Sequence, residues 1–269
     1  MEYRQLGRTG EKTSTIGMGT WRFGTHRSAE ERAMQVRSLQ RGIELGMNLI
    51  DTAEIYASGR SEEVVGEAIR GRRDSVFIAT KVAPDNLHRD DVIKSCRASL
   101  QRLGISQVDL YQIHWPDPKV PIKETMSAME QLVRDGLIRY IGVSNFSVKE
   151  TEDARMALAR NEIVSNQVEY SLRRRDVERD ILPYCVREKV TLMAYSPLDR
   201  GNIPDSISTS ILHKYRLTPA QAMLNWVTRN ERVVAIPKAA DVSHLEENAA
   251  SVSVRFQPAE YDRISSGRP

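Results

Sequence analysis

The chain has 269 residues, of which 40% are hydrophobic and 28% are charged, and its formal net charge is +3. This is the composition of an ordinary globular protein, and the length allows one large core. The densest basic cluster, residues 173–175, is followed at once by Asp176 and Glu178, which indicates a solvated loop and disfavours a nucleic-acid surface. The N-terminus lacks a basic-then-apolar leader and no apolar run could span a bilayer, so we expect no membrane partner.

The two cysteines, Cys96 and Cys185, lie far apart and lack the spacing of metal ligands. Their number fits a reducing cytoplasmic setting, and the helical pattern places Cys96 in the core. The five histidines also lack ligand spacing and carboxylate company, so we expect no metal site.

The chain begins with a polar segment, residues 1–14, in which Gly7 and Gly10 predict a short hairpin or cap. After it, apolar strands alternate with amphipathic helices. The expected strands are 15–20, 48–53, 76–82, 108–115, 138–144, 165–170, 191–195 and 233–236. The expected helices are one that begins at the capping box 28–31, one through Met126, Met129 and Val133, and those at 61–70, 89–103, 147–160, 176–188, 206–215, 219–230, 241–250 and 258–265.

Eight strand-helix units in about 250 residues predict a closed (β/α)8 barrel and not an open doubly wound sheet. Residues 1–269 then form one barrel domain, capped by the hairpin at 1–14 and a short C-terminal helix at 258–265. A dinucleotide fingerprint of the G-x-G-x-x-G type is excluded, because after Gly17 and Gly19 its third glycine falls on Arg22.

Chemistry in such barrels gathers at the C-terminal ends of the strands. Asp51, Lys81 and His114 lie near the ends of the second, third and fourth expected strands, and Tyr56 follows in the loop after the second. Because consecutive strands are neighbours, we expect these four side chains, hereafter the tetrad, to converge. The competing interpretation is a buried structural ion pair beside a core histidine, which is less consistent with four such residues at adjacent strand ends.

The chain resembles the aldo-keto reductase superfamily over residues 17–248. The motifs that carry the resemblance are Asp51–Tyr56, Lys81, His114, Ser144–Asn145, Gln167, Ala194–Leu198 and Ile236–Lys238. The resemblance implies NAD(P)H-dependent reduction of a carbonyl group. It implies that Tyr56 is the general acid, that Lys81, paired with Asp51, lowers the pKa of the phenol, and that His114 orients the carbonyl oxygen.

The resemblance also implies the cofactor site. Ser144, Asn145 and Gln167 are similar to residues that bind the nicotinamide carboxamide, and Tyr195 to the aromatic residue that stacks on the ring. Further positions assigned to the cofactor in this way are Gly19, Thr20, Trp21, Ser196 and Leu198.

The adenosine end departs from the family pattern. Lys238 is present, but Ala239 and His244 stand where members selective for NADPH carry serine and arginine for the 2′-phosphate. Compared with such members, the chain keeps the lysine cation and lacks the arginine guanidinium, which can bind a phosphate with two hydrogen bonds. Glu247 and Asn248 match positions that contact adenine. We expect NADPH as the cofactor, with weak discrimination against NADH.

The substrate pocket is expected between Trp21, Tyr56, His114 and Trp115, open to simple aldehydes and ketones, in a protein that is a monomer by default. Two other functions stay open. One is a regulatory barrel that binds the nucleotide without turnover, as potassium-channel β-subunits do, although an intact tetrad disfavours it. The other is an aldolase in which Lys81 forms a Schiff base.

Overall fold

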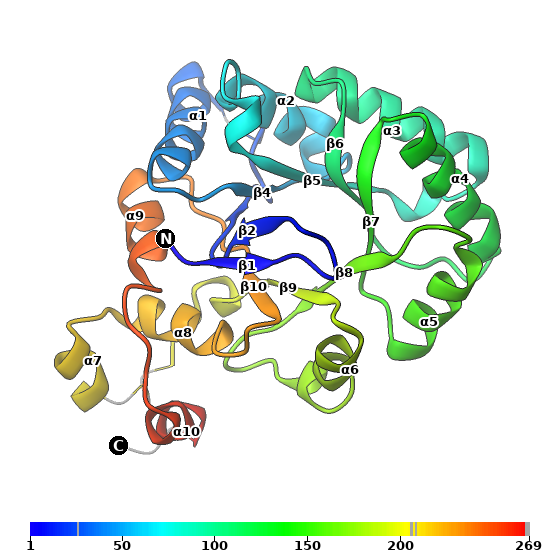
Figure 1. Ribbon diagram of the computed structural model, residues 1–269. Coiled ribbons are helices and arrows are strands. Elements are labelled where there is room, and N and C mark those ends of the chain that lie inside the picture. Colours follow the sequence, from blue (N-terminus) through cyan, green and yellow to red (C-terminus); the bar gives the residue numbers. More distant parts are fainter. Residues whose placement is uncertain (26, 205–206, 208, 267–269) are drawn as a thin grey trace.

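The computed structural model describes residues 1–25, 27–204, 207 and 209–266, and eight parallel strands form its central sheet (Figure 1). Sheet neighbours follow chain order. The strands are β3 (Met18–Gly19), β4 (Leu49–Asp51), β5 (Phe77–Val82), β6 (Val108–Ile113), β7 (Ile138–Ser144), β8 (Ile163–Glu169), β9 (Thr191–Tyr195) and β10 (Val233–Ala235). Every residue of β5 and β6 is buried, as expected for parallel strands covered on both faces.

The sheet closes between its first and last strands. Parallel bridges join Ile16 to Ala235 and Gly19 to Lys238. Gly19 is required at this seam, because a Cβ there would lie 2.5 Å from the carbonyl oxygen of Ile236. The closed ring confirms the predicted (β/α)8 barrel.

Helices surround the barrel, as Figure 1 shows. They are α1 (Ala29–Glu44), α2 (Arg60–Ala68), α3 (Arg89–Leu103), α4 (Ile122–Arg134), α5 (Val148–Ala157), α6 (Ile181–Glu188), α7 (Thr209–Tyr215), α8 (Pro219–Val227), α9 (Val242–Ala250) and α10 (Pro258–Ser266). Short 3₁₀ helices are η1 (Tyr56–Gly59), η2 (Arg73–Ser75), η3 (Pro84–Asn86), η4 (Asp176–Glu178) and η5 (Asp199–Gly201). The start of the expected helix 206–215 lies outside the described residues.

An antiparallel hairpin precedes the barrel, made of β1 (Tyr3–Gln5) and β2 (Lys12–Ser14). It is anchored to the starts of two strands. The Gly7 amide donates to Thr191 Oγ1 (2.8 Å), and Arg4 Nη1 donates to the carbonyl oxygen of Val233 (2.6 Å). The hairpin therefore covers the N-terminal end of the barrel and leaves the C-terminal end for the site.

The apolar core has two parts. One lies inside the barrel and consists of Leu6, Leu49, Phe77, Ala79, Leu110, Val164, Met193, Val234 and Ile236. The larger part lies between the strands and the surrounding helices. Towards the C-terminal end of the barrel the interior becomes polar, and the buried side chains there include Asp51 and Lys81.

Some expected helices are shorter than their patterns suggest; the helix expected at 219–230, for example, ends at Val227. The helix expected at 176–188 is interrupted, and α6 begins only after Asp180, whose side chain accepts from the Ile181 amide. Pro183 explains this, since proline has no N–H and fits only the first turn of a helix. The helix expected at 147–160 ends at Ala157, because the next free amides, those of residues 159–161, donate to the carboxylate of Glu130.

Candidate active site

A buried ion pair lies at the C-terminal end of the barrel. Lys81 Nζ donates to Asp51 Oδ2 (2.8 Å) and to the carbonyl oxygen of Thr52 (2.8 Å). Burial alone lowers the pKa of Lys81, but the Asp51 carboxylate and Tyr56 outweigh it and hold that pKa above its usual value. The amine is therefore protonated, and its charge is fixed in position.

Tyr56 lies above this pair, at the start of η1. Its ring is partly buried, and its centroid is 5.1 Å from Lys81 Nζ. The next residues, Ala57 and Ser58, have φ values of 51° and 56°, a left-handed conformation that turns the chain sharply after β4. Strain of this kind in a non-glycine pair is common where a loop holds a functional side chain.

The pKa of Tyr56 is set by opposing influences. Burial raises this pKa and Asp51 adds to that effect. Lys81 lowers it, as the sequence predicts, but does not reverse the sum. The physical reason is that a phenolate loses more hydration in this position than one cation restores. The phenol of Tyr56 is therefore protonated at neutral pH, which is the form that can donate.

His114 completes the cluster. Its ring lies edge-on to Tyr56, with centroids 5.6 Å apart, and stacks on Trp115 at 4.2 Å. Burial, aided by the charge of Lys81, lowers the pKa of His114 to about 2, so the imidazole is neutral. Its Nδ1 is buried without a partner among the described residues. The structure thus brings all four tetrad residues together from three adjacent strands.

The residues expected at the carboxamide lie beside the tetrad and are linked to it. Asn145, at a φ of 61°, donates from Nδ2 to the carbonyl oxygen of His114 (2.9 Å). Tyr195 donates its hydroxyl to Asn145 Oδ1 (2.9 Å), and Ser144 Oγ donates to the carbonyl oxygen of Gln167 (2.9 Å). These four side chains therefore form one rim at the ends of β7, β8 and β9.

Gln167 has a second contact that the sequence does not predict. Its Nε2 donates to Asp51 Oδ1 at 2.7 Å, and both side chains are buried. β8 lies four strands from β4 in the ring of eight, so this bond crosses the barrel interior. The alternation of side chains along β8, which turns Ser165 and Gln167 to the same face, is the only sequence signal for it.

A cationic rim lies where β3 and β10 meet. Trp21 is 46% exposed. The guanidinium groups of Arg22 and Arg200 lie over its ring, with Cζ 4.4 Å and 6.0 Å from the ring centroid. Partial burial and the charge of Arg22 hold the pKa of the exposed Lys238 below its usual value. No carboxylate of the described residues pairs with Arg22 or Lys238. Arg200 was not expected from the sequence.

The other expected cofactor residues differ in accessibility. Gly19 is in the barrel wall, and the Thr20 hydroxyl donates to the carbonyl oxygen of Asp51 (2.9 Å), so that side chain is already engaged. In the loop after β9, Ser196 has a φ of 49° and the partly buried Leu198 packs against the core.

The adenosine-end residues lie on or before α9, between α1 and α8 in Figure 1. His244 is exposed, whereas Ala239 and Asn248 are buried. The carboxylate of Glu247 accepts from the hydroxyl of Thr218 at the start of α8. Of these residues, His244 is therefore the most accessible to a ligand, and Glu247 is held by a neighbouring helix.

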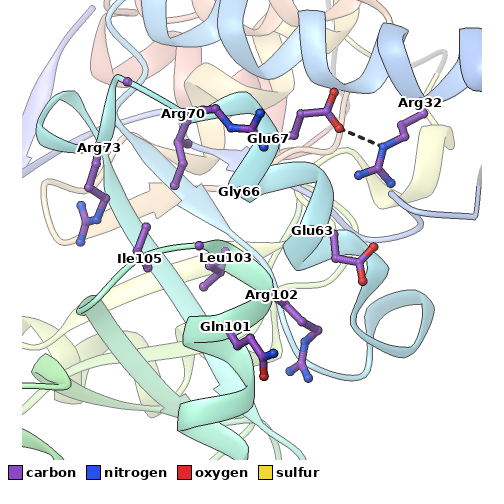
Figure 2. A pocket seen from close by; sticks show the side chains of 13 residues that line it. Arg32, Glu63, Gly66, Glu67, Arg70, Arg73, Gln101, Arg102, Leu103 and Ile105 are labelled. Carbon is purple, nitrogen blue, oxygen red and sulfur yellow. Dashed lines mark hydrogen bonds and ion pairs between the residues drawn. The ribbon is translucent and has the colours of Figure 1, made fainter.

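A cavity of about 500 Å³ lies elsewhere, outside the barrel between α2 and α3 (Figure 2). Its lining mixes charged and apolar residues, and Arg32 Nε pairs with Glu67 Oε2 at 2.9 Å. It includes no tetrad residue and no residue expected at the cofactor. The candidate active site is therefore identified by the chemistry of its side chains and not by this cavity.

Within the described ranges, no cluster of three or more histidine, cysteine or acidic side chains could hold a metal ion. None of the helices in the described part of the chain is suited to crossing a membrane. Cys96 and Cys185 are buried free thiols.

The family model described as "Aldo/keto reductase family" matches residues 15–268. The chain is 40% identical over 260 residues to methylglyoxal reductase YeaE of Escherichia coli strain K12, covering 94% of this chain and 90% of that protein.

Two solved structures have the same fold. The thermostable aldo-keto reductase Tm1743, crystallised with the inhibitor epalrestat, matches with a TM-score of 0.94 and 42% identity over 99% of this chain and 100% of that one. An aldo/keto reductase from Klebsiella pneumoniae in complex with NADP and acetate matches with a TM-score of 0.92 and 37% identity over 100% of this chain and 97% of that one.

Proposed function

Because the chain belongs to the aldo/keto reductase family and is an NAD(P)H-dependent oxidoreductase that reduces carbonyl groups, we propose that the tetrad performs this reaction. The observation that carries the proposal is the buried ammonium of Lys81, fixed by Asp51 and placed 5.1 Å from the ring of Tyr56. A structural ion pair has no need of an adjacent phenol and a neutral imidazole, and this arrangement supplies two donors for one oxygen.

The mechanism assigns a separate task to each tetrad residue. The reduced nicotinamide dinucleotide supplies the hydride when bound. Tyr56 and the neutral His114 donate hydrogen bonds to the carbonyl oxygen, which gains negative charge in the transition state. Tyr56 then gives its proton to that oxygen, a step that positioned general acids accelerate by about 10²–10⁴-fold. Lys81 stabilises the phenolate left behind, and Asp51 keeps Lys81 in place.

The residues present fit such a cofactor. Arg22 and Lys238 are two neighbouring cations without a carboxylate partner among the described residues, an arrangement that suits phosphate groups. We propose that Gln167, Ser144 and Asn145 hold the carboxamide, and that Tyr195 stacks on the ring. Gly19, Thr20, Trp21, Ser196 and Leu198 would line the path between these two ends, and Glu247, Asn248 and His244 the adenosine end.

Small aldehydes and ketones are the proposed substrates, with 2-oxoaldehydes such as methylglyoxal first among them. The name of the Escherichia coli relative supports this substrate class. The exposed indoles of Trp21 and Trp115 support an open pocket mouth that takes small carbonyl compounds. Pocket residues are then Trp21, Tyr56, His114 and Trp115.

The experiment that tests the function is a screen of small carbonyl compounds against the oxidation of NADPH and NADH. We expect turnover with both cofactors and a preference for NADPH. A regulatory barrel predicts binding without turnover. An aldolase predicts a borohydride-trapped adduct at Lys81 and no consumption of the reduced cofactor.

We further propose that the chain acts as a single-domain monomer in a reducing cytoplasmic setting. The two buried free thiols support the reducing environment. Size-exclusion chromatography with light scattering tests the monomer.

A further inference from the structure

Asp51 is held by two side chains that reach it from different parts of the barrel. Lys81 Nζ donates to its Oδ2 at 2.8 Å, and Gln167 Nε2 donates to its Oδ1 at 2.7 Å. Lys81 comes from the adjacent strand β5, and Gln167 comes from β8, four strands away from β4. The carboxylate therefore has one donor for each oxygen, and only one of them belongs to the tetrad.

This contact fixes the orientation of the Gln167 amide. A carboxylate can only accept hydrogen bonds, so Gln167 must present its Nε2 to Asp51 and keep Oε1 as its remaining acceptor. None of the described residues donates to Oε1. The main chain of Gln167 is fixed as well, since its carbonyl oxygen accepts from Ser144 Oγ (2.9 Å) and from the Asn145 amide (2.8 Å).

We propose that Gln167 is a positioning residue that couples the cofactor to Asp51 through the two ends of one amide. The inference rests on the proposed function, in which Gln167 holds the nicotinamide carboxamide. With Nε2 committed to Asp51, Oε1 accepts an N–H from that carboxamide. A carboxamide bound in this way also restrains Asp51 through Gln167. Because Asp51 holds Lys81, the position of the Lys81 ammonium beside Tyr56 is restrained as well.

A simpler role is that Gln167 contacts the carboxamide and that its bond to Asp51 has no consequence for binding. The two roles predict opposite effects of a carboxylate at this position. A carboxylate is a stronger acceptor for an N–H than an amide oxygen, so a pure contact would be preserved or strengthened. Two carboxylates 2.7 Å apart cannot both ionise cheaply, so a coupled residue would be disrupted once the shared proton is lost.

The test is the variant Gln167→Glu, measured as the NADPH dissociation constant by quenching of tryptophan fluorescence. When protonated, the introduced carboxyl group copies the amide, with an O–H for Asp51 and a C=O for the ligand. We expect near wild-type affinity at about pH 6. At about pH 9 the dissociation constant rises at least ~10-fold relative to the wild type at the same pH, since one unit of pKa shift corresponds to a factor of ten.

The double variant Asp51→Asn/Gln167→Glu is the matched control. It keeps the introduced carboxyl group and removes the facing charge, so the added pH dependence disappears. Other titratable groups near this position are Lys81, Tyr56, His114, Glu169 and Tyr195. They are present in the wild type and in every variant, so the wild type serves as their control. Gln167→Met, which lacks both ends of the amide, binds NADPH more weakly at every pH and gains no pH dependence.

The melting temperature of the cofactor-free proteins gives a second readout. The introduced carboxyl group has a folded-state pKa raised above its unfolded value, so its contribution to stability is lost as the pH rises through the folded value. At about pH 9, Gln167→Glu therefore has a lower melting temperature than the wild type. Adding Asp51→Asn to this variant removes the loss. Failure of the single variant to fold at alkaline pH, with folding recovered in the double variant, would show the same contact between positions 51 and 167.

The coupling is refuted if Gln167→Glu binds NADPH as well as the wild type at about pH 9, or if the loss persists in the double variant. Failure of the proposed function has a different signature. If the cofactor site is absent, the wild-type protein binds no NADPH at any pH, and a regulatory barrel binds NADPH without turnover. In both cases the melting temperatures still report the contact between positions 51 and 167.

Discussion

Lys81 and Asp51 form an ion pair of 2.8 Å whose side chains are 0% and 3% exposed, so the barrel buries both charges at the end where the tetrad converges. Such a pair is weak support for stability, because desolvation offsets much of the attraction. Its position beside Tyr56 gives it a chemical use that stability alone does not explain.

Breaking this pair is expected to destabilise the protein. Lys81→Met leaves the Asp51 carboxylate buried with Gln167 as its remaining donor, which should cost about 3–5 kcal/mol in the free energy of unfolding. Chemical denaturation measures it. The double variant Lys81→Met/Asp51→Leu should recover most of that stability and none of the activity, because both charges are gone. Equal stability of Lys81→Met and the wild type would contradict the burial of the pair.

His114 predicts how stability depends on acid. Its folded-state pKa of about 2 lies below its unfolded value of about 6.5, so the unfolded chain takes up this proton first as the pH falls. Stability therefore decreases below about pH 6.5, by at most ~1.4 kcal/mol per pH unit from this residue. The effect is measured by denaturant unfolding of the wild type and of His114→Gln between pH 7 and pH 4. Parallel profiles of unfolding free energy against pH would refute it.

Cofactor selectivity is expected to respond at position 244. His244 is exposed on α9, and His244→Arg would add a guanidinium for the 2′-phosphate of NADPH. A hydrogen bond to a charged group contributes about 1.5–3 kcal/mol, so the KM for NADPH should fall about tenfold or more. NADH lacks that phosphate and is the control. A similar change for both cofactors would place position 244 away from the phosphate.

The seam of the barrel is expected to tolerate no side chain at position 19. The Cβ of Gly19→Ala would meet the carbonyl oxygen of Ile236 at 2.5 Å, a backbone atom that cannot rotate away. We expect a loss of about 1–3 kcal/mol, as for other overpacked sites. Gly10→Ala is the matched control, because nothing lies within 4 Å of its Cβ. A seam variant as stable as this control would disprove the close approach.

Much of the fold is predictable because local signals agree with the global arrangement. The apolar stripe and the left-handed Gly104 define α3 at the expected residues, 89–103. Errors occurred where one residue carries the decisive signal. Because of Pro183, α6 begins later than expected. The carboxylate of Glu130, a residue of another helix, accepts hydrogen bonds from the amides that would otherwise extend α5. The second cause is tertiary, so no local pattern contains it.

The tetrad is predictable because adjacent strands bring their ends together in any barrel of this kind. The bond between Gln167 and Asp51 is not, since the residues are 116 positions apart and meet only across the closed ring. The net pKa of Tyr56 is not predictable from the sequence for a related reason, although Lys81 does lower it as expected. Its value depends on how deeply the loop after β4 buries the ring, and neighbouring charges alone do not determine that.

The most direct test of the central claim is the turnover of Tyr56→Phe with NADPH and a small aldehyde. Removing one hydroxyl should lower kcat by at least ~10²-fold, the usual contribution of a general acid, while the dissociation constant for NADPH stays within a few-fold of the wild type. Near-normal turnover in this variant would mean that another group supplies the proton and that the tetrad is not the catalytic centre.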